Sequence, residues 1–183
     1  NDSSWGKLES RDRAFVKLLV MSCIRQNGQL NICIDHFLKK PPKPQIRTII
    51  MLGVAQLFVL KTEPHAAIHT SVSLARHLTG ESYTGLTNGV LRTIARSGKK
   101  IFEATSPIDN LPPFFRKNWS KNWGESTVRQ IMYLTQNQAP LDITLKKMPE
   151  SSKVKWCQRL CAKLISANSV RLEPVADVTQ LPG

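Results

Sequence analysis

The chain has 183 residues, enough for one well-cored domain or for one domain with a small appendage. It contains 26 Lys and Arg against 13 Asp and Glu, and the net charge of +13 favours a polyanionic partner such as nucleic acid. No apolar run reaches the roughly 18 residues of a membrane-spanning helix, and no signal peptide is evident, so a membrane protein is not expected.

Apolar residues at helical spacing predict two amphipathic helices, at residues 12–26 and 30–38. The inward stripe expected on the first consists of Phe15, Leu18, Leu19 and Cys23, widened by Val16, Val20 and Ile24. Two prolines, Pro41 and Pro42, end the second helix because proline cannot continue it. Pro44 then begins a third helix, over residues 45–60, which is apolar on nearly every side and is predicted to be buried at the centre.

Four further helices are predicted in the next part of the sequence. They cover residues 64–78, residues 86–94 with a break near Gly98, a short segment opened by Pro112 and Pro113, and residues 128–134. Short loops join these roughly seven helices, so the predicted fold class is mainly α, a helical bundle.

The sequence pattern changes near residue 139. Residues 141–146 alternate as a strand does, residues 152–165 have a helical pattern, and residues 169–172 resemble a second strand. A β-α-β unit of this size buries too little surface to be stable alone. We therefore expect a helical domain over 1–138 and a partial α/β subdomain over 139–183, at the front of a longer protein.

No constellation of residues predicts catalysis or a resident metal. His65 and His69 lie one helical turn apart, but no second pair follows, and both are interpreted as ordinary helix residues. Neither a nucleophile elbow nor a glycine-rich phosphate loop occurs. Gly89 is interpreted as permitting close helix packing. All four cysteines, including Cys157 and Cys161 on an expected core face, fall in apolar helical patterns, which favours a reducing cytoplasm.

Three groups of basic residues are the candidate RNA-binding residues: Arg11, Arg13 and Lys17; Arg92, Arg96, Lys99 and Lys100; and Arg116, Lys117 and Lys121. Aromatic residues interleave with the third group, a combination that suits a phosphate backbone with stacked bases. Of these aromatics, Phe115 and Trp119 are interpreted as core residues. For Arg11, Arg13, Arg92 and Arg96, RNA binding and a merely solvated role both stay open.

Four motifs in order resemble one family: SRDRAF at 10–15, LGVAQL at 52–57, PHAAI at 64–68 and GLTNGVLR at 85–92. Together they resemble the NusB-type helical domain, most of all the version at the front of RsmB-type (Sun/Fmu) 16S rRNA cytosine-C5 methyltransferases. Further motifs, NLPP at 110–113 and PLDI at 140–143, resemble that family's junction into its small α/β subdomain. VRL at 170–172 and LPG at 181–183 match its lead-in to the methyltransferase core.

The resemblance implies an RNA-binding module that positions ribosomal RNA for a catalytic domain beyond residue 183. That domain would use S-adenosylmethionine and supply the nucleophilic cysteines, so no cofactor is expected within this chain. Arg11 and Arg13 match the arginine-rich segment through which free-standing NusB proteins contact RNA. Positions His65 and Asn88 are interpreted as tying loops to helix ends.

A second hypothesis is a protein-interaction factor like the transcription-antitermination NusB proteins. Its partner would be a small ribosomal protein, with no membrane involved. The β-α-β tail argues against this alternative, because the free-standing factor has no use for such a segment.

Overall fold

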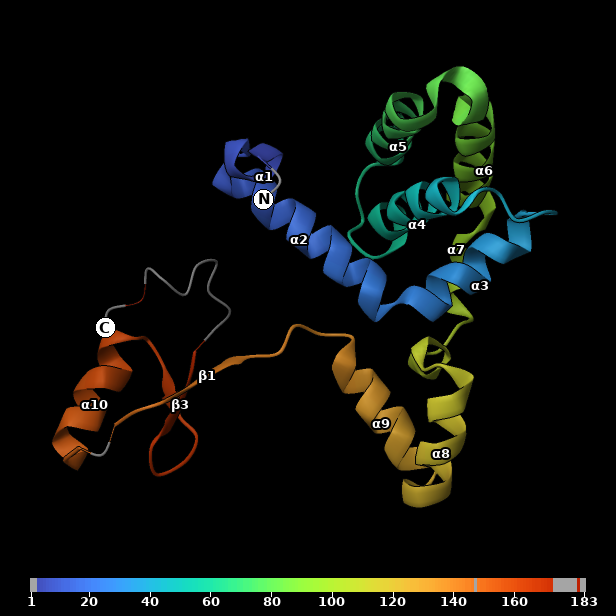
Figure 1. Cartoon of the computed structure of the whole chain (residues 1–183). Helices are drawn as coiled ribbons and strands as arrows, with labels where there is room; N and C mark the ends of the chain where they lie inside the picture. The colour runs from blue at the N-terminus through green and yellow to red at the C-terminus, as the bar shows by residue number, and fades with distance from the viewer. Residues whose placement is uncertain (1–2, 147, 173–180, 182–183) are drawn as a thin grey trace. The chain divides into compact units, whose positions relative to one another are not determined.

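The structure, a computed structural model, describes residues 3–146, 148–172 and 181 (Figure 1). The chain divides into two compact units, Asn1–Gln136 and Asn137–Gly183. The first unit is helical, and the second combines one helix with a small sheet. The mainly α fold class predicted from the sequence is therefore confirmed.

The first unit contains most of the regular structure. Its α-helices are α1 (Ser3–Lys7), α2 (Ser10–Arg25), α3 (Asn27–Phe37), α4 (Pro44–Phe58), α5 (Pro64–Thr79), α6 (Thr84–Ser97), α7 (Lys99–Glu103), α8 (Pro113–Trp123) and α9 (Glu125–Thr135). Two 3-10 segments, η1 (Gly80–Tyr83) and η2 (Pro107–Asn110), join some of them. The short helices α1 and α7 are additional to the seven predicted, and α7 is separated from α6 at Gly98, as expected.

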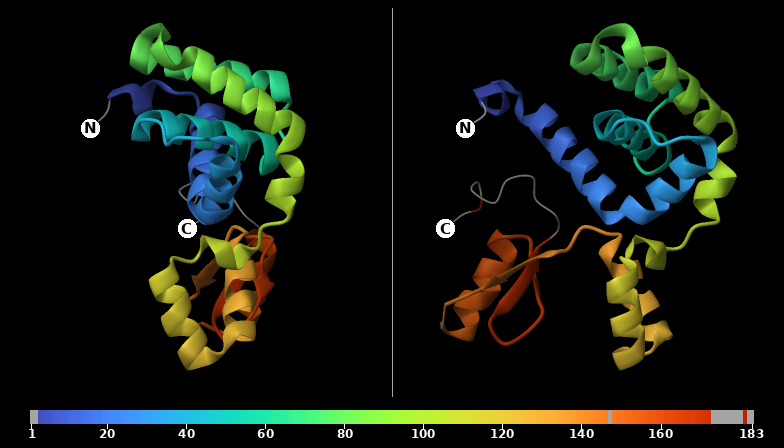
Figure 2. Two further views of the ribbon diagram at one scale, coloured as in Figure 1. Left: turned by 90° about the vertical axis from the view of Figure 1, so that its right-hand side faces the viewer. Right: turned by 45° about the vertical axis from the view of Figure 1, so that its right-hand side comes forward.

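Helix α4 lies at the centre of the main core, as its nearly continuous apolar sequence predicted. It contacts α2, α3, α5 and α6, and Ile46, Ile50 and Val54 are fully buried. A Cβ atom on Gly53 would lie 2.8 Å from the Leu91 methyl groups and 2.8 Å from Ser71 Oγ. Glycine therefore lets α5 and α6 pack directly on α4, and this fixes the two helices side by side (Figure 2).

The apolar stripe predicted for the first helix is not an inward face over most of α2. Phe15, Leu18 and Ile24 are exposed, and so are Val16 and Val20. Only the C-terminal part reaches the main core, where Cys23 is buried and Leu19 packs against the cluster. Helical spacing identified the amphipathic helix, but it could not show that α2 extends past the helices that would cover it.

A second, smaller core joins η2, α8 and α9. Ile108, Val128 and Met132 are buried there, and Trp119 packs against them, as predicted for this residue. The prediction for Phe115 was wrong, because this residue is 47% exposed. It lies one helical turn before Trp119 and contacts that ring edge-on, with the centroids 6.1 Å apart, while Trp119 alone of the two packs against the buried cluster.

The second unit is a three-stranded antiparallel sheet with one helix. Its elements are β1 (Leu141–Thr144), α10 (Glu150–Arg159), β2 (Lys163–Leu164) and β3 (Ser169–Leu172), and the strand order is β1-β3-β2. Asp142 faces Arg171 across β1 and β3, and two hydrogen bonds of 2.7 and 2.8 Å join the side chains. The hydrogen bonds from Arg171 lower the pKa of Asp142.

The predicted β-α-β pattern was incomplete because the helix ends earlier than expected. Cys161 has a left-handed backbone with φ 48°, Cys161 N–H donates to the Gln158 carbonyl, and Ala162 N–H donates to the Cys157 carbonyl. This is a Schellman C-cap, usually made with glycine. Because cysteine occupies that position, no local residue pattern indicated the end of the helix, and β2 was predicted as helix. Cys161 is consequently exposed and not on a core face.

The cysteines differ in exposure, and we expect their reactivities to differ accordingly. Burial raises the pKa of the Cys23 and Cys33 thiols to about 11, so both remain protonated near pH 8, while Cys161 is exposed. Brief iodoacetamide treatment of the folded chain should therefore alkylate Cys161 first and Cys23 and Cys33 last, as read by peptide mass spectrometry. Equal labelling of Cys33 and Cys161 before unfolding would contradict this expectation.

Candidate nucleic-acid interface

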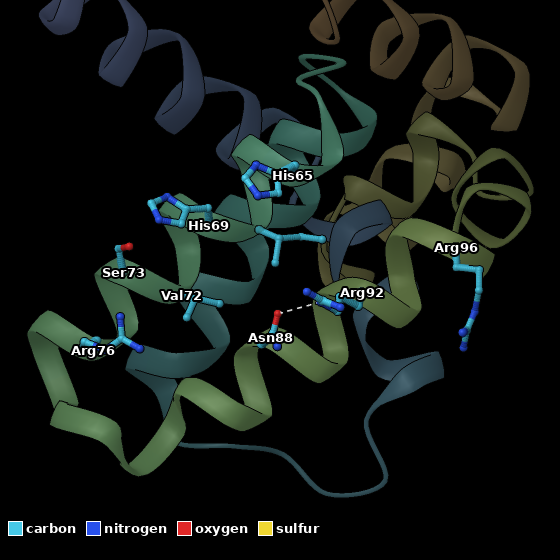
Figure 3. Close-up of a pocket in the computed structure, with 9 residues that line it drawn as sticks. His65, His69, Val72, Ser73, Arg76, Asn88, Arg92 and Arg96 are labelled. Atoms are coloured by element: carbon cyan, nitrogen blue, oxygen red, sulfur yellow. Dashed lines mark hydrogen bonds between the residues drawn. The ribbon is translucent and has the colours of Figure 1, made fainter.

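A groove of about 590 Å³ runs between the exposed faces of α5 and α6 (Figure 3). It lies wholly within the first unit. The residues that line it are His65, Ile68, His69, Val72, Ser73, Arg76, Asn88, Arg92 and Arg96.

Helical spacing aligns these side chains along both walls. On α5 the lining residues recur every three or four positions from His65 to Arg76, while Ala67, Ser71 and Ala75 are buried on the other side. On α6 Asn88, Arg92 and Arg96 follow at intervals of four, while Thr87, Leu91 and Ile94 are buried. Each helix therefore buries one face in the core and presents a second, mainly polar row of side chains to the groove.

The groove is strongly cationic. Three of its nine lining residues are arginines, and none of the nine is an aspartate or a glutamate. Arg76 lies at one end and Arg96 at the other, with Arg92 between them beside Asn88 (Figure 3). Such a row of guanidinium groups suits a phosphate chain, because each guanidinium donates several hydrogen bonds in a planar fork.

Two of the three arginines have neighbours that orient them. Arg76 Nε lies 2.6 Å from Glu81 Oε1, and both side chains are more than half exposed. The hydrogen bonds from Arg76 and then Thr84 lower the pKa of Glu81, so this carboxylate partly offsets the charge at that end. Arg92 Nε donates to Asn88 Oδ1 at 3.1 Å, a contact that orients the guanidinium without neutralising it.

The second predicted basic group is divided by the structure. Arg92 and Arg96 line the groove. Lys99 and Lys100 follow on α7, where Lys99 Nζ lies 3.7 Å from Glu103, and neither lysine lines the groove. The role of this second basic group in RNA binding stays a prediction.

The first predicted group is on α2, away from the α5–α6 groove lining. Arg11 and Lys17 are exposed. Arg13 is half-buried, and its guanidinium donates a hydrogen bond to the Leu8 carbonyl, so part of its donor capacity stabilises the turn between α1 and α2.

The third predicted group, on α8, contains one arginine engaged in the fold. Arg116 lies 3.0 Å from Glu125 and 3.9 Å from Asp109. Hydrogen bonds from Ser120 and then Arg116 lower the pKa of Glu125, so the carboxylate stays ionised and holds Arg116 against α9. Lys117 and Lys121 are exposed on α8.

Besides the apolar Ile68 and Val72, sequence reasoning did not select the five other polar residues of the groove: His65, His69, Ser73, Arg76 and Asn88. The spacing of three or four residues between them could be seen within the sequence of each helix. That the two helices, about twenty residues apart in the sequence, lie side by side could not. Asn88 was interpreted as tying a loop; instead it accepts a hydrogen bond from Arg92 on the same helix. His65, given the same role, is exposed in the first turn of α5.

The packing role predicted for Gly89 is wrong. This residue is exposed on α6, and a Cβ atom added there would have no neighbour within 4 Å. Gly53 provides the close approach between helices instead, at a position that the sequence did not distinguish.

The part of the chain that the structure describes contains no group of three or more His, Cys, Asp or Glu side chains that could hold a metal ion. In the same residues no helix is sufficiently long and apolar to cross a membrane.

These observations define a helical domain with a cationic groove on two adjacent helices. The chain belongs to the NusB family, whose model matches residues 2–96 and so includes α5 and α6 up to Arg96. The resemblance noted in the sequence is thereby confirmed.

The chain is also similar to bacterial proteins named ribosomal RNA small subunit methyltransferase B. Identity is 28% to the protein of Xanthomonas campestris pv. campestris, 26% to that of Cronobacter sakazakii and 27% to that of Escherichia coli. Each alignment covers 97% of this chain but only 42%, 44% and 44% of the respective relative. The chain thus spans less than half the length of the curated relatives it matches.

Proposed function

We propose that this chain is the RNA-binding, substrate-positioning module of a 16S rRNA methyltransferase. In this proposal it works in the bacterial cytoplasm and holds ribosomal RNA for a C-terminal domain of the same parent protein. That domain would transfer a methyl group from S-adenosylmethionine to C5 of a cytosine. We do not propose that any of the groove residues binds that cofactor.

The observation that supports the proposal best is the arginine row of the α5–α6 groove. Arg76, Arg92 and Arg96 line one continuous surface without a carboxylate among the lining residues. Counterion release from RNA supplies most of the binding energy in such a surface, and it is insensitive to sequence. A module of this kind positions RNA, and the site of methylation is selected elsewhere.

The proposal predicts salt-dependent RNA binding by the chain alone. If three arginines contact phosphates of a single strand, log Kd should rise with log salt concentration with a slope of about 2. Affinity should then fall more than about tenfold between 50 and 200 mM salt. Fluorescence anisotropy with a labelled 16S rRNA fragment measures this directly. A salt-independent affinity would contradict the proposed phosphate contacts.

The alternative protein-interaction function gives a different result in the same preparation. A chain that binds no RNA at 50 mM salt but captures a purified small ribosomal protein would replace our proposal with that alternative. Binding of both would leave RNA positioning as the function and add the ribosomal protein as a partner.

A further inference from the structure

Two histidine rings form one wall of the groove. His65 and His69 are exposed in the first two turns of α5, their ring centroids are 6.2 Å apart, and their planes are within 11° of parallel. Both line the groove, beside the half-buried Ile68 and Val72 (Figure 3). Neither ring makes a hydrogen bond or an ion pair within the described part of the chain, so their faces and edges are available to a ligand.

The orientation of the rings suits a planar ligand. Their centroids are 6.2 Å apart and their planes are nearly parallel, so their exposed faces offer a stacking surface for a base beside them, while the gap is shorter than the roughly 6.8 Å that a base inserted between two rings would need at ordinary stacking distances. A metal ion would need further ligands, and no third His, Cys, Asp or Glu completes such a group among the described residues. Histidine faces are, in contrast, common stacking partners of unpaired RNA bases.

The surroundings of the rings fit the rest of a nucleotide. Ile68 and Val72 supply an apolar floor, which favours the face of a base or a ribose over a solvated ion. Because Asn88 Oδ1 already accepts from Arg92, the Asn88 amide nitrogen remains as a donor toward a base edge. Arg92 itself keeps its terminal nitrogens for a phosphate. Stacking, edge recognition and charge therefore coincide within one groove.

We propose that the α5–α6 groove binds an unpaired nucleotide of RNA, whose base stacks on His65 and His69 while Arg92 contacts the adjoining phosphate. This inference rests on the proposed function and specifies its ligand as single-stranded rather than duplex RNA. In an A-form duplex the bases are already stacked inside the helix, and the exterior offers mainly phosphates and 2′-hydroxyls. The two rings would gain nothing from such a ligand.

The test compares two RNAs with equal numbers of phosphates, an unstructured single strand and a duplex. The variants are His65→Ala with His69→Ala, and His65→Phe with His69→Phe. The control is His77→Ala, since His77 is also exposed on α5 but does not line the groove. Circular dichroism of each variant establishes that the helices are retained.

We expect the double alanine variant to bind the single strand roughly 5- to 100-fold more weakly, and the duplex within about twofold of the unaltered chain. The double phenylalanine variant should retain single-strand affinity, because it keeps two aromatic faces without histidine's charge or hydrogen bonds. A 2-aminopurine in the strand should show quenched emission with the unaltered chain and not with the alanine variant.

Other outcomes separate this inference from the proposed function. Equal weakening of both RNAs by the alanine variant, or failure of phenylalanine to restore single-strand binding, overturns base stacking but leaves RNA binding intact. A large effect of His77→Ala also overturns it, since that ring is outside the groove. If the unaltered chain binds neither RNA at low salt, the proposed function itself fails.

Discussion

Replacing Arg76, Arg92 and Arg96 together by alanine is expected to weaken binding of 16S rRNA fragments about 100-fold at 0.1 M salt. Each exposed guanidinium that donates to a phosphate is worth roughly 1 kcal/mol, since charge-assisted hydrogen bonds are strong but solvent screens them here. Because the contacts are to phosphate, the loss should be similar for unrelated RNA sequences. The salt slope should fall toward zero in the same titration.

A control with the same change of net charge distinguishes local contacts from long-range attraction. Lys39, Lys40 and Lys155 are exposed and lie outside the groove lining, so their joint replacement by alanine removes three positive charges without touching it. We expect this variant to lose only a few-fold in affinity. Equal losses in the two triple variants would mean that net charge, and not the groove, attracts RNA.

The basic group on α2 needs its own variant, because the structure does not place it on the groove. Changing Arg11, Arg13 and Lys17 to alanine tests whether RNA extends to that helix. If the α2 variant binds RNA more weakly and the groove variant binds it normally, the RNA-binding surface lies on α2 and not on α5 and α6.

Much of the fold was predictable because its helices follow local rules. Pro44, Pro64 and Pro113 mark the first turns of α4, α5 and α8, and the continuous apolar sequence of α4 identified the central helix. Those signals require only neighbours along the chain. Predicting that Phe15 and Leu18 are exposed would have required the positions of α3 and α4 in space. No local sequence pattern contains that information.

The groove was predictable in part for the same reason. Arg92 and Arg96 stand out as the basic residues of α6, so composition alone selected them. Arg76 is in a stretch of zero net charge, and its importance arises only when α5 packs beside α6. His65 and His69 were noticed for their spacing, but a metal was the only ligand considered; the parallel rings became evident from the structure.

Replacing Gly28 by alanine is expected to destabilise the first unit by about 3 kcal/mol. A Cβ atom at this position of α3 would lie 1.9 Å from the Asp109 carbonyl oxygen and 2.8 Å from the Asn110 Cα atom. These neighbours belong to the backbone of η2, so no side-chain rotation can relieve the overlap. Helix α3 and η2 would have to separate.

Separation would also break the polar contacts that join the two segments. Gln29 N–H donates to Asn110 Oδ1 at 2.9 Å, and Asn110 Nδ2 donates to Gln29 Oε1 at 2.8 Å. Gln29 Nε2 donates to Thr105 Oγ1 at 2.8 Å. Since Gln29 is buried, donors and acceptors lost there are not fully replaced by water, which adds to the steric cost.

Urea unfolding of Gly28→Ala measures the effect, and Gly89→Ala is its matched control on another helix. At Gly89 the added methyl meets nothing within 4 Å, so alanine should stabilise α6 by up to about 1 kcal/mol through its higher helix propensity. If Gly28→Ala lowers the free energy of unfolding and Gly89→Ala raises it, the close approach of the η2 backbone to α3, and not glycine's flexibility, determines the effect at Gly28. If Gly28→Ala unfolds at the same urea concentration as the unaltered chain, α3 and η2 do not pack as described.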